Sequence, residues 1–468
     1  MTSAQNHPQP SSGNNYIYHT LLLFSAWFGC SQKIQPSLMQ SHPSETQVFQ
    51  KDTFKPDQKI ILPVDTLHWI DVSEKNLSIR EPLEKITPGK ELAGNLTNVF
   101  KENYNIQLFI PLNSLQYSSN ALSENRFLQF YSGVLLALED LEKEGASLRI
   151  KVEDTGIKNY NIYNTWPFIK NDEIDAIIGP FERDDLKFIT SEAALKKVMV
   201  ISPWQTSTKI TTQNPYYIQL KPNLKEHFKR MVEHACTNYS PDQVMIVTHE
   251  GQEGQSWYNY MNEVCSVYLG TNENLRHFTV HEDSLISPNT AFVNVFKNNP
   301  PQAIILPYYS FNDEQKLYEV VRRLIVDKNN SKVTLYTMPL FLESDKIDFE
   351  FYNSFITRVA ISDFVDENSY NVRQFKRKYY ELFGEICGPD ALKGYDVMMF
   401  TGKNLFQHGT NFQSSVTGTK LKYLQTQIEL QETKGETNAN NEVNSFDFYE
   451  NKHISIIEFK TSGFDIID

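Results

Sequence analysis

The sequence contains few cysteines. Four of its 468 residues are Cys, and none has the spacing to another Cys or His that a metal site requires. We therefore predict no metal site. Cys236 and Cys265 fall on two helical patterns that flank one predicted strand, which leaves two alternatives open: a disulfide, or two separate buried thiols.

The sequence also lacks a basic surface. It has 44 Lys and Arg against 57 Asp and Glu, so the formal net charge is −13. Binding to nucleic acid needs clustered Lys and Arg, and no basic stripe occurs. We therefore predict no nucleic-acid partner, and we interpret the acidity as a contribution to solubility.

Motifs of catalysis are missing as well. There is no Gly-x-Ser-x-Gly, His-Glu-x-x-His, P-loop or dinucleotide fingerprint. His249-Glu250-Gly251 follows a predicted strand but has no spaced ligand partner, so we interpret it as the edge of a cleft. We therefore predict that the protein is not an enzyme and carries no cofactor. No motif supports the alternative of a hydrolase of the cell envelope.

Long hydrophobic runs are absent apart from one short segment near the start. Tyr16–Gly29 is shorter than the roughly 20 apolar residues of a membrane-spanning helix, and its length and position fit the apolar part of a secretory signal. Gly29 before Cys30 resembles a bacterial lipobox. We predict a lipoprotein signal over residues 1–30 with Cys30 as the lipidation site; a plain cleaved signal and a chance apolar run are the alternatives.

Residues 31–103 are rich in Pro, Ser, Gln, Lys and Glu and show little periodicity. Such a composition buries little apolar surface, so we predict a mostly disordered tether. The alternative is that part of it packs on the folded body.

Strand and helix patterns alternate from Ile106 onwards. Ile106–Leu112 is a continuous apolar run, typical of a strand buried on both faces, and Arg126–Lys143 has the apolar spacing of an amphipathic helix. Alternation of this kind predicts right-handed crossovers and a mostly parallel sheet. The pattern restarts at Leu224, which indicates two similar lobes.

Four segments resemble one family in content and order. They are Phe127–Thr155, Asp175–Pro180 (DAIIGP), Val198–Thr208 (VMVISPWQTST) and Phe375–Phe400. Together they resemble the leucine/isoleucine/valine-binding family of type I periplasmic binding proteins, over roughly Ile106 to Asp468. With a Cys-anchored tether in front, the chain is most similar to substrate-binding-like lipoproteins of the Bacteroidota.

This resemblance implies an α/β fold with two doubly wound parallel-sheet lobes, joined by a hinge with a cleft between them. Residues 104–221 with 358–420 are expected to form lobe one. Residues 222–357 with 443–468 are expected to form lobe two and the hinge. Ser445–Tyr449 and Ile454–Phe459 are expected to be strands of one hairpin.

The resemblance also implies ligand contacts. In amino-acid binders the loop after Gly-Pro presents a Ser; here Arg183 is near that place, and an Arg can bind a carboxylate or phosphate with two hydrogen bonds. Thr206 matches the Thr of the next loop, where Trp204 would narrow the pocket. The predicted ligand-binding residues are Arg183, Trp204, Gln205, Thr206, Ser207, Tyr308 and Tyr309. Surface charge, loop capping, packing and sheet capping are the alternative roles for these residues.

The implied function is a non-enzymatic binding protein of the bacterial cell envelope. It would close two lobes around a small polar ligand, such as an amino acid or a cell-wall fragment, and be recognised by an ABC permease or another envelope complex. The strand ending near Thr337 is followed by no acidic residue for an α-ammonium group, which argues against amino-acid specificity. The alternative is an outer-membrane lipoprotein that regulates cell-wall synthesis and has a degenerate cleft. Both readings imply a lipid-anchored protein in the periplasm.

Overall fold

The computed structural model describes residues 98–114, 126–281, 284–285, 291–434, 446–461 and 463–467. These residues belong to one compact unit, Lys85–Asp468. The predicted signal segment, Cys30 and the predicted tether up to residue 97 lie outside the described residues. Among the described helices, none is both long and apolar enough to cross a membrane.

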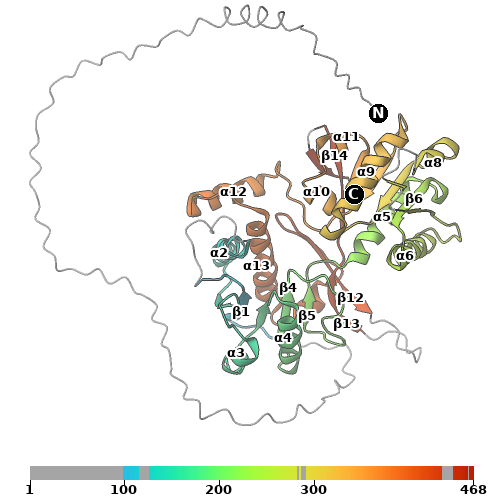
Figure 1. The fold of residues 1–468 in the computed structure, drawn as a ribbon. Helices are drawn as coiled ribbons and strands as arrows, with labels where there is room; N and C mark the ends of the chain where they lie inside the picture. Colours follow the sequence, from blue (N-terminus) through green and yellow to red (C-terminus); the bar gives the residue numbers. More distant parts are fainter. Residues whose placement is uncertain are drawn as a thin grey trace, which may run out of the picture. The chain divides into compact units, whose positions relative to one another are not determined.

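Two β-sheets form the folded body (Figure 1). The first has eight strands in the order β11-β12-β13-β5-β4-β3-β1-β2, and the second has seven in the order β15-β14-β10-β9-β8-β6-β7. We call the first sheet with its helices lobe one and the second lobe two. In lobe one, β1 is followed by β2 on one side and by β3 on the other; in lobe two, β6 is followed by β7 on one side and by β8 on the other. This is doubly wound topology, and its switch points lie between β1 and β3 and between β6 and β8.

Lobe one combines parallel strands with helices of both halves of the chain. Its strands are β1 (Tyr104–Ile110), β2 (Leu148–Asp154), β3 (Ala176–Ile178), β4 (Met199–Ser202), β5 (Tyr217–Gln219), β11 (Lys420–Lys422), β12 (Gln427–Lys434) and β13 (Phe446–Asn451). Its helices are α2 (Arg126–Lys143), α3 (Ile162–Ile169), α4 (Arg183–Leu195), α12 (Tyr370–Phe383), α13 (Pro389–His408) and α14 (Gln413–Val416). The buried run of β1 packs against α2 and α13, which contact each other closely.

A pair of glycines allows this contact between α2 and α13. A Cβ on Gly133 would lie 1.9 Å from the carbonyl oxygen of Ala391, and a Cβ on Gly394 would lie 1.9 Å from that of Phe130. The two backbones therefore meet directly, which no other residue type permits at these positions.

Lobe two repeats the arrangement. Its strands are β6 (Val244–His249), β7 (Arg276–Val280), β8 (Ala303–Leu306), β9 (Thr334–Thr337), β10 (Ile356–Ile361), β14 (Ser455–Lys460) and β15 (Gly463–Ile466). Its helices are α5 (Leu224–Asn238), α6 (Gln252–Leu269), α8 (Val293–Asn298), α9 (Glu314–Lys328), α10 (Leu340–Glu343) and α11 (Phe349–Asn353), with short 3-10 turns at Pro241–Gln243 and Phe311–Asp313. Apolar clusters cover both faces of the sheet, as the continuous apolar strands predict.

Within the described residues, three segments cross between the lobes. We call Leu220–Asn223 the first crossing, Ser362–Ser369 the second and Lys452–Ile454 the third; they join β5 to α5, β10 to α12 and β13 to β14. The predicted α/β fold with two doubly wound lobes is confirmed.

Two predicted lobe boundaries differ from the sheet topology. β10 pairs in parallel with β9, so Arg358 and its neighbours belong to lobe two, and the chain returns to lobe one only after Ile361. β13 pairs in parallel with β5, so the segment up to Asn451 belongs to lobe one. The predicted hairpin is wrong, because β13 and β14 lie in different sheets.

Candidate functional site

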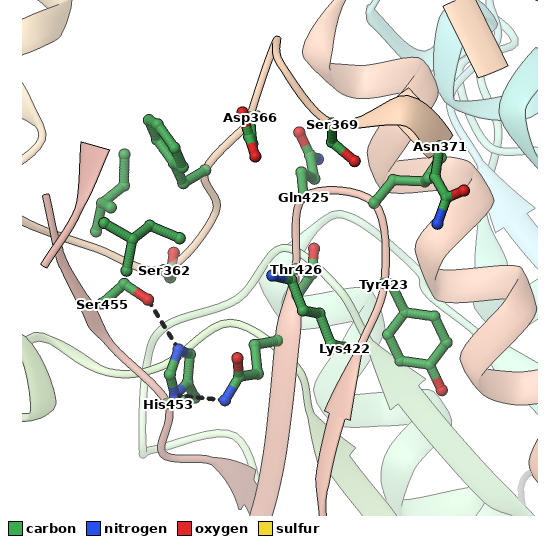
Figure 2. Close-up of a pocket in the computed structure, with 15 residues that line it drawn as sticks. Ser362, Asp366, Ser369, Asn371, Lys422, Tyr423, Gln425, Thr426, His453 and Ser455 are labelled. Carbon is green, nitrogen blue, oxygen red and sulfur yellow. Dashed lines mark hydrogen bonds between the residues drawn. The ribbon is translucent and has the colours of Figure 1, made fainter. Parts of the chain in front are cut away.

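A cavity of about 390 Å³ lies where two crossings meet, and we call it the hinge pocket (Figure 2). It is bounded by the second crossing, the third crossing and the turn between β11 and β12. Its lining residues are Ile361, Ser362, Phe364, Asp366, Ser369, Asn371, Lys422, Tyr423, Leu424, Gln425, Thr426, Gln427, His453, Ser455 and Ile466. Most of these side chains are polar, so the pocket suits a polar occupant better than an apolar one.

The β11–β12 turn is fixed in place by one buried carboxylate of α13. Asp396 is 1% exposed and accepts backbone N–H groups of Leu424, Gln425 and Thr426 at 2.9, 3.0 and 2.9 Å. Burial raises the pKa of Asp396 to about 7, although these hydrogen bonds act in the opposite direction. One wall of the hinge pocket thus depends on a single side chain that lies behind it.

A second carboxylate attaches the second crossing to the same turn. Asp363 accepts the Thr426 hydroxyl at 3.1 Å and the Lys393 ammonium at 3.1 Å. The Phe364 N–H donates to the Gln425 carbonyl at 2.9 Å. Burial alone would raise the pKa of Asp363, but the nearby charges of Lys393 and Lys221 lower it. The second crossing therefore cannot move without disturbing the turn.

The third crossing contributes His453. Its Nδ1 lies 3.3 Å from the Gln427 amide nitrogen and its Nε2 lies 2.9 Å from the Ser455 hydroxyl. Because an amide nitrogen only donates, Nδ1 accepts and the ring proton is on Nε2. In Figure 2, dashed lines mark these two hydrogen bonds at the foot of the pocket. His453 thus ties β12 of lobe one to β14 of lobe two.

Groups of both charges stand at the exposed rim. Lys422 supplies an ammonium and Asp366 a carboxylate, and Ser369 and Asn371, which follow Asp366 along the chain, also line the pocket (Figure 2). One oxygen of Asp366 accepts the Asn368 N–H at 2.9 Å. The rim can therefore bind a small molecule that carries both an acidic and a basic group.

The first and third crossings are joined by a buried ionic cluster. Glu450 is fully buried and accepts the Asn223 N–H at 2.8 Å and the Lys452 ammonium at 2.5 Å. The same Lys452 ammonium bonds Glu226 of α5 at 2.8 Å. Burial of three charged groups is tolerated because each has a partner.

The predicted residues of lobe one lie at the start of α4, just after β3, and on the loop after β4. Arg183 donates to the Ser207 hydroxyl at 3.3 Å, and the Gln205 amide donates to the Phe181 carbonyl at 2.8 Å. Arg183 and Thr206 are exposed. These segments follow β3 and β4, beside the switch point of lobe one, where open α/β sheets bind ligands.

Trp204 lies in a different environment from its neighbours. It is 8% exposed, and its ring centroid is 4.9 Å from that of Phe130, 5.7 Å from Phe181 and 5.8 Å from Phe127. The ring is part of the lobe-one core. This environment matches the alternative role of packing.

Tyr308 and Tyr309 follow β8 at the switch point of lobe two. Tyr308 is 1% exposed, its hydroxyl lies 2.5 Å from Nδ1 of His249, and burial raises its pKa. Tyr309 is 42% exposed and donates to Glu253 at 3.5 Å. Within the described ranges, no hydrogen bond or ring contact joins this pair to the lobe-one loops, and neither group lines the hinge pocket.

The hinge pocket was not predicted from the sequence. Its walls come from segments far apart in the chain, and their meeting depends on β13 pairing with β5. One signal was present: Asp396 is a carboxylate in an otherwise apolar stretch of the segment Phe375–Phe400. A buried carboxylate in such a position needs donors nearby, and these donors are the turn of the pocket.

Comparisons with known proteins identify the fold. No family model and no curated protein matches the sequence. A putative branched-chain amino acid ABC transporter from Rhodospirillum rubrum is similar in structure, with a TM-score of 0.55 and 14% identity over 78% of this chain and 99% of that one.

Two further structures show the same likeness. An ABC transporter substrate-binding protein from Desulfitobacterium hafniense has a TM-score of 0.50 and 12% identity, covering 78% of this chain and 100% of that one. Full-length LpoA from Haemophilus influenzae has a TM-score of 0.50 and 14% identity, covering 79% of this chain but only 60% of that one. Identities this low establish the fold alone. The described part of the chain has the two-lobed fold of the type I periplasmic binding proteins, as its sequence motifs predicted.

Proposed function

We propose that the protein is a non-enzymatic binding protein of the bacterial cell envelope whose two lobes close around a small polar ligand in the hinge pocket. The hinge pocket supports this proposal most strongly, because two of the three crossings line it. The lobes can rotate relative to each other only if the crossings change conformation. An occupant of the hinge pocket therefore binds one lobe arrangement better than another, which is the requirement for ligand-driven closure.

The ligand class follows from the rim. Lys422 offers a cation, Asp366 an anion, and the amides and hydroxyls offer both donors and acceptors, while Phe364 and Ile466 add apolar surface. A small zwitterionic molecule, such as an amino acid or a peptide-bearing cell-wall fragment, meets all of these groups.

The switch-point loops are a second proposed contact set. Arg183, Gln205, Thr206 and Ser207 would bind the ligand from lobe one, and Tyr309 from lobe two. Trp204 and Tyr308 would hold these loops in position from the core, since both are buried.

Location and partners are proposed from the same fold. An anchor at Cys30 and a tether would keep the body at the membrane, where an ABC permease or another envelope complex recognises the closed form. One of the similar structures is described as a putative branched-chain amino acid ABC transporter and another as an ABC transporter substrate-binding protein, which supports binding rather than catalysis.

Regulation of cell-wall synthesis is the second candidate. The likeness to LpoA favours it, since the C-domain of LpoA is described as a regulator of PBP1A. The loop after Gly179-Pro180 favours it too, because Arg183 stands where amino-acid binders have a hydroxyl.

A thermal-shift panel of amino acids, short peptides and cell-wall fragments tests the proposal. A ligand at about 100 times its Kd stabilises a protein by about 2.7 kcal/mol, which is a readily measured rise in Tm. We expect one class to raise Tm in the wild type and in Lys420→Ala, and to have no effect in the Lys422→Ala/Asn371→Ala variant.

Other outcomes separate the alternatives. If Arg183→Ala/Thr206→Ala abolishes the shift and Lys422→Ala/Asn371→Ala does not, the ligand binds the switch-point loops and not the hinge pocket. If no class raises Tm and the tagged protein captures a cell-wall synthase from the envelope, the second candidate replaces the first.

A further inference from the structure

Two thiols of lobe two lie in contact. Cys236 is in the last turn of α5 and Cys265 is in the last turns of α6, 29 residues further along the chain. Their Sγ atoms are 2.8 Å apart and are not bonded to each other. Both side chains belong to the core between α5, α6 and the sheet.

We propose that Cys236 and Cys265 form a disulfide that ties α5 to α6 whenever lobe two folds in an oxidising compartment. The two sulfur atoms are already side by side, and their separation exceeds the S–S bond of about 2.0 Å by only about 0.8 Å. A combined movement of the two sulfur atoms by about 0.8 Å closes this gap. Both thiols are free and buried in the structure, and the proposal selects the disulfide from the two alternatives that the sequence left open.

No other described thiol competes for either sulfur. Cys387 lies in a core cluster of lobe one with Leu136 and Tyr379, and its Sγ donates to the Gly388 carbonyl at 3.3 Å. Cys387 therefore lies in a different lobe from Cys236 and Cys265. Cys387 therefore serves as an internal control, because it should stay reduced under conditions that oxidise the pair.

The oxidant is a disulfide-bonded acceptor, either a low-molecular-weight disulfide or an oxidoreductase. The Cys236 thiolate attacks one sulfur of the acceptor, forms a mixed disulfide and releases one acceptor thiol. The Cys265 thiolate then attacks the Cys236 sulfur and releases the second acceptor thiol. Two electrons pass from the pair to the acceptor, and its two new thiols take up the two protons.

Burial determines when this exchange takes place. Cys236 is 7% exposed and Cys265 is 0% exposed, and burial raises the pKa of both thiols. The thiolate is the reactive form, so attack on the acceptor is slow in the folded lobe and fast before α5 and α6 pack, and the bond closes as their packing brings the two sulfur atoms together. Once formed, the bond is shielded from reductants by the same burial.

The bond would strengthen the hinge side of lobe two. α5 begins at the first crossing, where Asn223 bonds Glu450, and its Glu226 pairs with Lys452 of the third crossing. A disulfide between α5 and α6 would restrict the movement of the two helices relative to each other. A displacement of the first or third crossing would then move both helices together.

The experiment uses the full chain refolded with oxidised or reduced glutathione. Free thiols are alkylated in denaturant, and peptides are mapped by mass spectrometry. We expect oxidised protein to yield a linked Cys236–Cys265 peptide lacking two hydrogen atoms, with Cys387 alkylated in both samples. Alkylation of both Cys236 and Cys265 in the oxidised sample would overturn the proposal.

Stability gives a second readout. We expect oxidation to raise Tm by roughly 3–10 °C in the wild type, because a disulfide restricts the unfolded chain. A Cys387→Ser variant should show the same rise, and a Cys236→Ser/Cys265→Ser variant should show none. A redox-dependent rise that persists in the double variant would also contradict the proposal.

Discussion

Asp396 shows how one residue can shape a pocket that it does not line. Its carboxylate accepts three consecutive backbone N–H groups of the β11–β12 turn from a position inside lobe one. Because the carboxylate is buried, no water molecule can take its place as the acceptor of these N–H groups. The geometry of one wall of the hinge pocket is therefore set by a side chain that does not line the pocket.

Replacement of this carboxylate by an amide should destabilise the fold. In Asp396→Asn the side-chain amide nitrogen faces at least one of these backbone N–H groups. An amide nitrogen accepts no hydrogen bond, so that N–H becomes a buried unsatisfied donor, which costs about 1–3 kcal/mol. Urea denaturation monitored by circular dichroism should show this loss. Asp184→Asn is the control, since the Asp184 side chain is 86% exposed, and it should leave the midpoint unchanged. Equal midpoints for the two variants would refute this role of Asp396.

The raised pKa of Asp396 predicts a pH dependence of stability. Because its pKa is about 7 in the folded state and 3.8 ordinarily, the folded state holds the proton more tightly than the unfolded state. The resulting stabilisation is complete below about pH 4 and is lost as the pH rises through about 7. From pH 5 to 8 the wild type should therefore lose free energy of unfolding relative to Asp396→Asn. A difference between the two that stays constant over this range would contradict the assignment.

At the scale of elements, α2 and α13 determine how lobe one is assembled. The two helices come from opposite ends of the folded body, and their backbones meet at Gly133 and Gly394. Figure 1 shows α2 next to α13. Their contact brings the start of the chain's folded part and the return from lobe two into a single core.

Adding a methyl group at this contact should push the helices apart. In Gly133→Ala or Gly394→Ala the new Cβ would overlap a carbonyl oxygen, and overpacking costs typically about 1–3 kcal/mol. Alanine's better helix propensity, worth about 1 kcal/mol, offsets part of this cost. Differential scanning calorimetry should show a lower Tm for both variants. Gly463→Ala has no atom within 4 Å of its Cβ and should behave like the wild type; a similar fall in Gly463→Ala would show that packing is not the cause.

The strands of the folded body were predictable where apolar runs are long. Ile106–Leu112 was predicted as a strand, and β1 covers Tyr104–Ile110. The path of the short segment Lys452–Ile454 could not be predicted from apolar runs. Three residues between two strands can form a hairpin turn or cross from one sheet to the other. The choice depends on β13 finding β5 and β14 finding β10 as partners, and these contacts are long-range.

The candidate site was predictable only in part for the same reason. Arg183 and Ser207 do lie together, since both follow neighbouring strands of one parallel sheet. Trp204 comes from the same loop but turns into the core, which loop position alone cannot reveal. The hinge pocket needs the second crossing, the third crossing and the β11–β12 turn to meet, and no local pattern encodes that meeting.

At the scale of the whole molecule, the crossings determine how the two lobes can move. The first and third are joined by Glu450, Asn223 and Lys452, and the second is attached to the β11–β12 turn through Asp363. Motion of the lobes is therefore expected to change the second crossing and the β11–β12 turn together, and with them the hinge pocket.

Loss of the Lys452 ammonium should weaken the whole unit. Lys452→Met would leave the carboxylates of buried Glu450 and partly buried Glu226 without their cation, and breaking a buried ion pair typically costs about 3–5 kcal/mol. Lys420→Met is the matched control, because the Lys420–Glu429 pair is largely exposed on the Lys420 side and should cost at most about 1 kcal/mol. Urea unfolding of both variants measures the difference, and equal effects would argue against a structural role for the buried cluster.

The most direct test of the central claim is the distance between the lobes with and without ligand. Spin labels at Leu195→Cys in lobe one and Val267→Cys in lobe two occupy exposed positions, and pulsed electron paramagnetic resonance reports their separation. With saturating amounts of the ligand class that raises Tm, we predict a shift to a new, narrower distance distribution, and no shift in the Lys422→Ala/Asn371→Ala variant. An unchanged distribution in the wild type at saturation would contradict closure of the lobes around a ligand in the hinge pocket.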